Sequence, residues 1–160
     1  MIFFSKNEII EMAVKIEKQG FAFYDRASLR TDLNNDAKKL LQTLRDEEKV
    51  HEQTFLNLRE KIDNFDLKSD INWDEAKLYI QSMVDIHLFS QPEKAIQLAA
   101  SARDMKDLVS NAIQFEKDTL LFFYFIKKFV TKEKSKKAIE NIIDEEISHV
   151  VKLKKIQDTL

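Results

Sequence analysis

The stretch Glu47-Glu48-Lys49-Val50-His51 decides the fold, because it returns near the other end of the chain as Glu145-Glu146-Ile147-Ser148-His149. Each copy stands about one helical hairpin after an isolated Glu-Lys pair, at Glu17 and at Glu116. The offset between corresponding positions is 99 residues for these glutamates (17 to 116) and 98 for the histidines (51 to 149). A helical hairpin that occurs twice explains this repeat, since two such hairpins pack into a four-helix bundle with the repeated polar side chains pointing inward.

Composition favours an all-α protein with a single domain over residues 1–160. The chain has 160 residues, of which 44% are hydrophobic, and this is enough to build one core. It contains one Gly and one Pro. Sheet proteins need many tight turns that draw on these residues, so a β-rich fold is not expected.

Charge and hydropathy exclude several classes of partner. The net charge of −2 and the pI near 6.0 provide no basic field for nucleic acid. The longest apolar run, Leu120 to Ile126, is far shorter than the roughly 20 residues that span a bilayer, so no membrane partner is expected. The capping box Ser5-Lys6-Asn7-Glu8 starts a helix directly after the apolar residues 1–4, which argues against a secretory signal. We expect a cytoplasmic protein.

The chain contains no cysteine. This excludes disulfides, thiolate catalysis, iron-sulfur clusters and a four-thiolate iron site of the rubredoxin type on this chain. Any electron that the protein uses must therefore come from another molecule.

Apolar spacing of three and four residues predicts two antiparallel helical hairpins joined by a long helical crossover. The first hairpin comprises helices over residues 7–30 and from 36 to about 62–64. The second comprises helices over 104–130 and 135–158, joined by the turn Thr131 to Lys134. The crossover from 65 to 103 holds a capped start at Asn72, a helix over 76–89 and a short helix that begins at Pro92.

The repeated Glu and His residues form a candidate metal site. A Glu and a His three residues apart share one face of a helix and present an oxygen and a nitrogen to the same ion. Glu17 and Glu116 lie mid-helix among apolar residues, and a buried carboxylate is costly unless it is paired or bound to metal. The candidate ligands are Glu17, Glu48, His51, Glu116, Glu146 and His149. Four carboxylates and two imidazoles suit two iron ions, with manganese or zinc as possible substitutes.

Four residues close to these ligands have two interpretations each. Tyr24 returns to the face of Glu17 and either hydrogen-bonds a ligand, as a proton or electron donor, or packs in the core. Glu47 and Glu145 point about 100° away from the neighbouring ligands, and we interpret them as solvated rather than as partners of the ligands. Gly20 inside a helix indicates either close helix approach or room beside the metals.

Two further features have weaker functional signals. His87 has Val84 three residues before it instead of a glutamate, so we interpret it as a surface or crossover-packing residue. Six lysines gather around the turn of the second hairpin: Lys127, Lys128, Lys132, Lys134, Lys136 and Lys137. A solvated turn is the favoured interpretation of this cluster, with docking of an acidic electron donor as the alternative.

The motifs resemble those of the rubrerythrin branch of the ferritin-like superfamily. The matching stretches are Glu17 with Gly20 and Phe23-Tyr24, Glu47-Glu48-Lys49-x-His51, Glu116-Lys117-Asp118 with Phe122-Phe123, and Ile142-Ile143-x-Glu145-Glu146-x-x-His149. The resemblance covers nearly the whole chain and is weakest from Phe65 to Arg103. It implies a ferritin-like bundle in which the six candidate residues are the ligands and Glu48 and Glu146 bridge the two ions.

The resemblance also implies a function. Rubrerythrin-like proteins are non-haem di-iron oxidoreductases, so we expect reduction of hydrogen peroxide with electrons from an external donor such as a rubredoxin, in oxidative-stress protection by a homodimer. Their rubredoxin domain is absent here, and Ile113 and Thr119 stand where a further glutamate is found one turn from Glu116. Two alternatives are a ferroxidase or iron-binding protein that uses dioxygen and, of a different class, a structural helical bundle with incidental metal.

Overall fold

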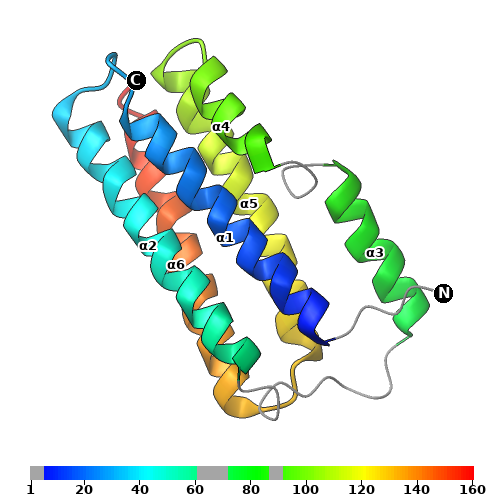
Figure 1. Ribbon diagram of the computed structural model, residues 1–160. Helices are drawn as coiled ribbons and strands as arrows, with labels where there is room; N and C mark the ends of the chain where they lie inside the picture. Colours follow the sequence, from blue (N-terminus) through cyan, green and yellow to red (C-terminus); the bar gives the residue numbers. More distant parts are fainter. Residues whose placement is uncertain (1–5, 61–71, 87–91) are drawn as a thin grey trace.

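The computed structural model describes residues 6–60, 72–86 and 92–160, and in these ranges the chain is all-α, as predicted (Figure 1). The helices are α1 (Lys6–Ser28), α2 (Asn35–Glu60), α3 (Trp73–Ile86), α4 (Pro92–Ser101), α5 (Met105–Phe129) and α6 (Glu133–Gln157). Helices α1 and α2 form one hairpin and α5 and α6 the other, and the two hairpins pack side by side as a four-helix bundle (Figure 1). This architecture confirms the predicted pair of hairpins with a helical crossover.

The predicted helix boundaries of the bundle agree closely with the observed ones. Helix α1 ends two residues earlier than predicted, and α6 begins two residues earlier. The predicted end of the second helix, at residues 62–64, lies outside the described residues. In the crossover, α3 begins at Trp73, directly after its predicted cap, and α4 begins at Pro92 as predicted. His87 also lies outside the described residues, so its predicted role stays a prediction.

Local side-chain hydrogen bonds explain where several helices begin. Asn34 Oδ1 accepts a hydrogen bond of 2.8 Å from the backbone N–H of Ala37 at the start of α2. Asp104 does the same for Asp107, at 2.8 Å, at the start of α5. Such caps satisfy backbone donors that have no partner within the helix. Short polar side chains therefore fix the starts of α2 and α5, whereas Lys132 makes no such bond at the start of α6.

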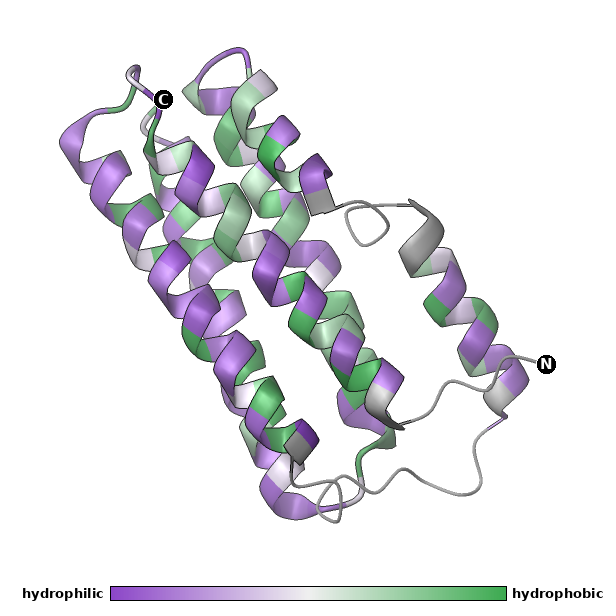
Figure 2. Ribbon diagram, viewed as in Figure 1, coloured by the Kyte–Doolittle hydropathy of each residue, from purple (hydrophilic) through white to green (hydrophobic). Residues whose placement is uncertain are grey.

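Aromatic side chains fill the space between the two hairpins. The rings of Phe23 from α1 and Phe115 from α5 stack with centroids 6.2 Å apart, and Phe55 from α2 meets Phe123 from α5 at 5.1 Å. All four side chains are at most 2% exposed. Burying one such ring contributes about 1.5–3 kcal/mol. Figure 2 shows the corresponding pattern, with hydrophobic and hydrophilic residues alternating along each bundle helix.

The crossover helices contact the bundle to different extents. Helix α4 packs against α1, and its Ala95 and Ala99 are fully buried. Arg30 donates hydrogen bonds to the carbonyl oxygens of Ala99 (3.2 Å) and Ala102 (2.9 Å), which ties the end of α4 to the turn after α1. Helix α3 stands to the side of the bundle (Figure 1), where Tyr79 stacks on Phe125 of α5 at 4.8 Å. None of the described helices is long and apolar enough to span a lipid bilayer.

Candidate metal centre

The bundle brings all six candidate ligands together in its interior. Each helix of the bundle contributes: Glu17 from α1, Glu48 and His51 from α2, Glu116 from α5, and Glu146 and His149 from α6. None of these side chains is more than 1% exposed. Placing four carboxylates away from water is unfavourable unless they meet a compensating charge. The cluster is therefore a site that needs a positive partner.

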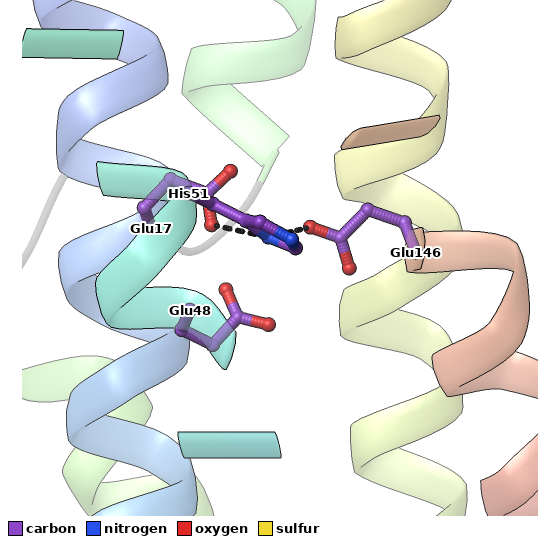
Figure 3. Close-up of side chains that lie close together, drawn as sticks. All are labelled: Glu17, Glu48, His51 and Glu146. Carbon is purple, nitrogen blue, oxygen red and sulfur yellow. Dashed lines mark hydrogen bonds and ion pairs between the residues drawn. The ribbon is translucent and has the colours of Figure 1, made fainter. Parts of the chain in front are cut away.

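The six side chains form two overlapping groups of possible donors. One group contains Glu17, Glu48, His51 and Glu146, and Figure 3 shows these four converging from α1, α2 and α6. The other contains Glu48, Glu116, Glu146 and His149. Within each group, one donor atom from every residue lies within 4.8 Å of the others. Glu48 and Glu146 belong to both groups, so two adjacent ion positions would share these two carboxylates.

The two histidines direct the same ring nitrogen toward the carboxylates. His51 Nδ1 lies 3.1 Å from Glu146 Oε1 and 3.5 Å from Glu17 Oε2. His149 Nδ1 lies 2.8 Å from Glu146 Oε2 and 3.3 Å from Glu116 Oε1. The two rings are nearly parallel, with centroids 5.7 Å apart and an interplanar angle of 18°. In both halves of the repeat, Nδ1 is therefore the nitrogen available to a metal.

The other ring nitrogen of each histidine meets a carboxylate from the opposite hairpin. Glu145 Oε2 of α6 lies 2.5 Å from His51 Nε2, and Glu47 Oε2 of α2 lies 2.9 Å from His149 Nε2. A carboxylate at Nε2 places the ring proton there and leaves the Nδ1 lone pair free for a metal. These contacts agree with the less favoured interpretation of Glu47 and Glu145, as partners of the ligands, and both side chains are also accessible to solvent. The rotation of about 100° turns each side chain toward the facing helix, where Glu47 stays 36% and Glu145 56% exposed.

Tyr24 belongs to the site as well as to the core. It is fully buried, its ring meets Phe23 edge-on at 5.3 Å, and its O–H donates a short hydrogen bond to Glu116 Oε1. Burial raises the pKa of Tyr24 well above its usual value, and the nearby charge of Glu116 raises it further. The phenol thus keeps its proton and donates a hydrogen bond to a candidate ligand, in agreement with the first of the two interpretations of this residue.

The pKa values of the clustered carboxylates shift in different directions. Burial raises the pKa of Glu17, Glu48 and Glu116 well above the ordinary carboxyl value, and the charge of Glu146 adds to this. Burial alone would also raise the pKa of Glu146, but hydrogen bonds from His149 and His51 outweigh it and hold that pKa far below its usual range. Burial alone would lower the pKa of His51, but the hydrogen bond to Glu146 and its charge outweigh burial and raise this pKa to about 9. Without metal, the cluster therefore holds protons at neutral pH.

The residues fit a pair of divalent cations. Five carboxylate oxygens are buried and have no hydrogen-bond partner among the described residues: both of Glu17, both of Glu48, and Oε2 of Glu116. A Cβ at Gly20 would lie 2.8 Å from Glu48 Cδ, so glycine leaves the room that this carboxylate occupies. Buried acceptors without donors are rare in proteins and call for an ion or an ordered water. Hard oxygen donors with two imidazoles suit iron.

Two features next to the site compare differently with the sequence prediction. The contacts of Glu47 and Glu145 were the less favoured interpretation, whereas Ile113 and Thr119 were expected beside Glu116. The role of Glu47 and Glu145 had a signal, because both copies of the repeat carry a glutamate directly before the motif. Thr119, one turn after Glu116, is 1% exposed, and its hydroxyl has no hydrogen-bond partner in the described part of the chain. Ile113, on the other side of Glu116, is 9% exposed. Neither side chain adds a carboxylate, so the centre keeps six candidate ligands.

Comparison with known proteins assigns the chain to a family. The rubrerythrin family model matches residues 8–157, which is nearly the whole chain. The chain belongs to the rubrerythrin family. This match confirms the resemblance drawn from the motifs, and the family together with the buried Glu and His cluster supports a di-iron protein.

A solved structure has the same fold as this rubrerythrin-family chain. It is the crystal structure of a protein from Thermotoga maritima that is described as a ferritin-like diiron-carboxylate protein. The two structures superpose with a TM-score of 0.71 over 99% of this chain and 97% of the other, at 22% sequence identity. The likeness shows a shared ferritin-like fold. No curated protein matches the sequence.

Proposed function

We propose that this rubrerythrin-family protein is a non-haem di-iron oxidoreductase that reduces hydrogen peroxide. The observation that carries the proposal is the buried cluster of six donors in two overlapping groups that share Glu48 and Glu146. Membership of the rubrerythrin family supports iron as the metal and a peroxide or oxygen as the oxidant. A bundle with only a structural role gains nothing from burying four carboxylates together.

Glu17 and His51 would hold one ion, Glu116 and His149 the other, and Glu48 and Glu146 both. When bound, the iron pair supplies two electrons that, with two protons, turn one hydrogen peroxide into two water molecules as both irons pass from Fe(II) to Fe(III).

The protein contributes orientation and exclusion of water. Glu145 and Glu47 hold the two imidazoles by their outer nitrogens, so that each inner nitrogen keeps its direction. Tyr24 holds Glu116 through Oε1, and Oε2, which has no hydrogen-bond partner within the described ranges, stays open to an ion. Complete burial of the six side chains keeps bulk water away from the reduced centre.

Electrons to restore the ferrous state come from a separate donor, such as a rubredoxin. The absence of cysteine supports this part of the proposal, because the chain has no thiolate iron site of its own. The proposal also includes a homodimer in the cytoplasm, as expected from the sequence.

A ferroxidase that oxidises Fe(II) with dioxygen is the second candidate. The observation that favours it is the pair Ile113 and Thr119, which leaves the centre without a further glutamate next to Glu116. Six ligands of this kind serve both reactions, so the first coordination sphere alone does not distinguish them.

The experiment that tests the proposal is stopped-flow oxidation of the anaerobically Fe(II)-loaded protein, mixed in parallel with hydrogen peroxide and with dioxygen. We expect much faster oxidation by peroxide. Indifference of the diferrous protein to peroxide would overturn the proposal, and a preference for dioxygen would assign the ferroxidase function. An unchanged melting temperature with and without Fe(II) would assign the structural bundle, because tight binding to the folded state must raise stability.

The assignment of the ligands has its own test. Replacing Glu116 or Glu48 by Ala should lower the iron content and the reactivity together, since each removes a donor of the centre. Retention of two irons per chain by either variant would contradict the assignment.

A further inference from the structure

A surface cavity lies between α2 and α6, over the middle of the bundle. Its volume is about 320 Å³. The lining residues are Glu47, Val50, Glu145, Ser148, His149 and Lys152. Val50 is 62% exposed and the Glu145 side chain 56% exposed, so the cavity opens to solvent. The six candidate ligands are closed off from water, and an ion that is to reach them needs a passage.

One imidazole borders both this cavity and the buried centre. His149 is in the cavity wall, yet it is fully buried, and its Nδ1 lies within 3.4 Å of Glu48, Glu116 and Glu146. A second cavity of about 290 Å³ lies between the end of α2 and the start of α6, and none of the six candidate ligands lines it. The cavity at His149 is thus the one of these two that leads to the centre.

The cavity wall offers two carboxylates to a cation. Glu47 and Glu145 are opposed among the lining residues by Lys152 and by the imidazole of His149. Despite burial, the pKa of this imidazole is raised by hydrogen bonds to Glu116, Glu146 and Glu48. The Lys152 Nζ atom lies 3.3 Å from both carboxylate oxygens of Glu47, whose Oε2 also meets His149 Nε2 at 2.9 Å. Carboxylates around an opening raise the local concentration of cations and speed their arrival. Oxygen donors at the mouth also suit a divalent ion that arrives with its water shell.

We propose that the cavity between α2 and α6 is the passage through which divalent metal ions reach the buried centre, with Glu47 and Glu145 as the first carboxylates that they meet. The ion would take the place of Lys152 beside Glu47 and then pass the ring of His149. This inference rests on the metal centre of the proposed function. It adds the route of loading, and it gives the two outer glutamates a second role besides holding the histidine rings.

Charge changes at Val50 test the passage, because Val50 is an exposed lining residue and not one of the candidate ligands. The probe is Co(II), mixed in excess with metal-free protein under anaerobic conditions, and the readout is the rate at which the visible absorption of bound cobalt develops. We expect Val50→Lys to slow uptake and Val50→Glu to speed it, each by about threefold at low ionic strength. This is the effect of one unit charge that acts through water on an ion passing several ångströms away. The amount of cobalt bound at the end should be the same in all variants.

The matched controls are Leu121→Lys and Leu121→Glu. Leu121 is also an exposed apolar residue, at 55%, but it lies on α5, which does not line the cavity. These variants should load at the wild-type rate. The effect of the Val50 variants should fade in about 1 M salt, where charges interact only over about 3 Å.

Wild-type rates in both Val50 variants would overturn the passage, and so would equal effects of the Leu121 variants, because the charge would then act from anywhere on the surface. A wild-type protein that binds no cobalt and no iron at all would instead overturn the metal centre itself. Full cobalt binding at unchanged rates would contradict only the passage. Absence of any binding would contradict the metal centre, so the inference and the proposed function can fail separately.

Discussion

Gly20 lies in the middle of α1, one turn after Glu17, where glycine weakens a helix by about 1 kcal/mol relative to alanine. A Cβ at this position would stand 2.8 Å from Glu48 Cδ and 3.1 Å from Phe115 Cε1. Phe115 is 2% exposed and stacked on Phe23, so it has little room to yield. The helix is therefore weaker at this residue, and the Glu48 carboxylate keeps its place in both groups of donors.

Gly20→Ala should reduce metal binding more than it changes the metal-free fold. The added methyl group displaces Glu48, while better helix propensity offsets part of the packing strain of about 1–3 kcal/mol. We expect a smaller rise in melting temperature on adding Fe(II), and less than two irons per chain by metal analysis. Lys15→Ala, at an exposed position of the same helix, is the control and should keep the full rise. A full iron complement in Gly20→Ala would show that the glycine has no role at the site.

Tyr24→Phe should destabilise the metal-free protein. It removes the hydrogen bond from the phenol to Glu116 Oε1 and leaves a fully buried carboxylate less satisfied, which costs about 1–3 kcal/mol. In a chain of this size the melting temperature should fall by a few degrees, roughly 2–4 °C per kcal/mol. Tyr124→Phe, at a 49% exposed position of α5, is the matched control and should melt like the wild type. Equal shifts in the two variants would contradict the role of the Tyr24 hydroxyl.

At the scale of elements, the bundle helices could be predicted to within about two residues at every end but that of α2, whose predicted end lies outside the described residues, because their signals are local. Apolar spacing marks each buried face, and Asn34 and Asp104 mark two of the starts through their own caps. The contacts of Glu47 and Glu145 with His149 and His51 could not be predicted in this way. They depend on how α2 faces α6, and helix periodicity gives the direction of a side chain but not what stands opposite.

The crossover offers an element-scale prediction at Arg30. Its guanidinium donates to the carbonyl oxygens of Ala99 and Ala102, which are among the groups at the end of α4 that lack partners within the helix. Arg30→Ala should cost about 1.5–3 kcal/mol, the usual range for hydrogen bonds to a charged group. Amide hydrogen exchange should speed up in α4 more than in α1 or α2. The exposed Arg26→Ala on α1 serves as control, and uniform acceleration in Arg30→Ala would show that α4 is not anchored by this side chain.

At the scale of the whole molecule, two copies of one hairpin build a site with approximate two-fold symmetry. His51 and His149 stack across it, and each receives its outer carboxylate from the other hairpin. Neither hairpin alone contains both groups of donors, since each group draws on residues from both hairpins. The metal would therefore link the hairpins, and its binding free energy would add to the stability of the bundle.

This linkage makes the effect of metal on stability dependent on pH. The pKa of Glu17, Glu48 and Glu116 is raised above the ordinary value of 4.5, and that of His51 is raised from 6.5 to about 9. Between pH 4.5 and about pH 9 the folded metal-free protein therefore holds more protons than the unfolded chain, and its free energy of unfolding falls as the pH rises. The lowered pKa of Glu146 acts in the opposite sense, but its contribution is already present above 4.5 and is lost only as the pH falls further.

A metal must displace the same protons, so its binding strengthens as the pH rises. We expect the melting temperature of the metal-free protein to fall from about pH 5.5 to about pH 8.5, while the further rise produced by saturating Fe(II) under anaerobic conditions grows over this range. Proton release on adding Fe(II) to weakly buffered protein measures the displacement directly. A constant difference in melting temperature, with no protons released, would mean that the metal binds away from the buried carboxylates. In that case the two overlapping groups of donors would not be the centre.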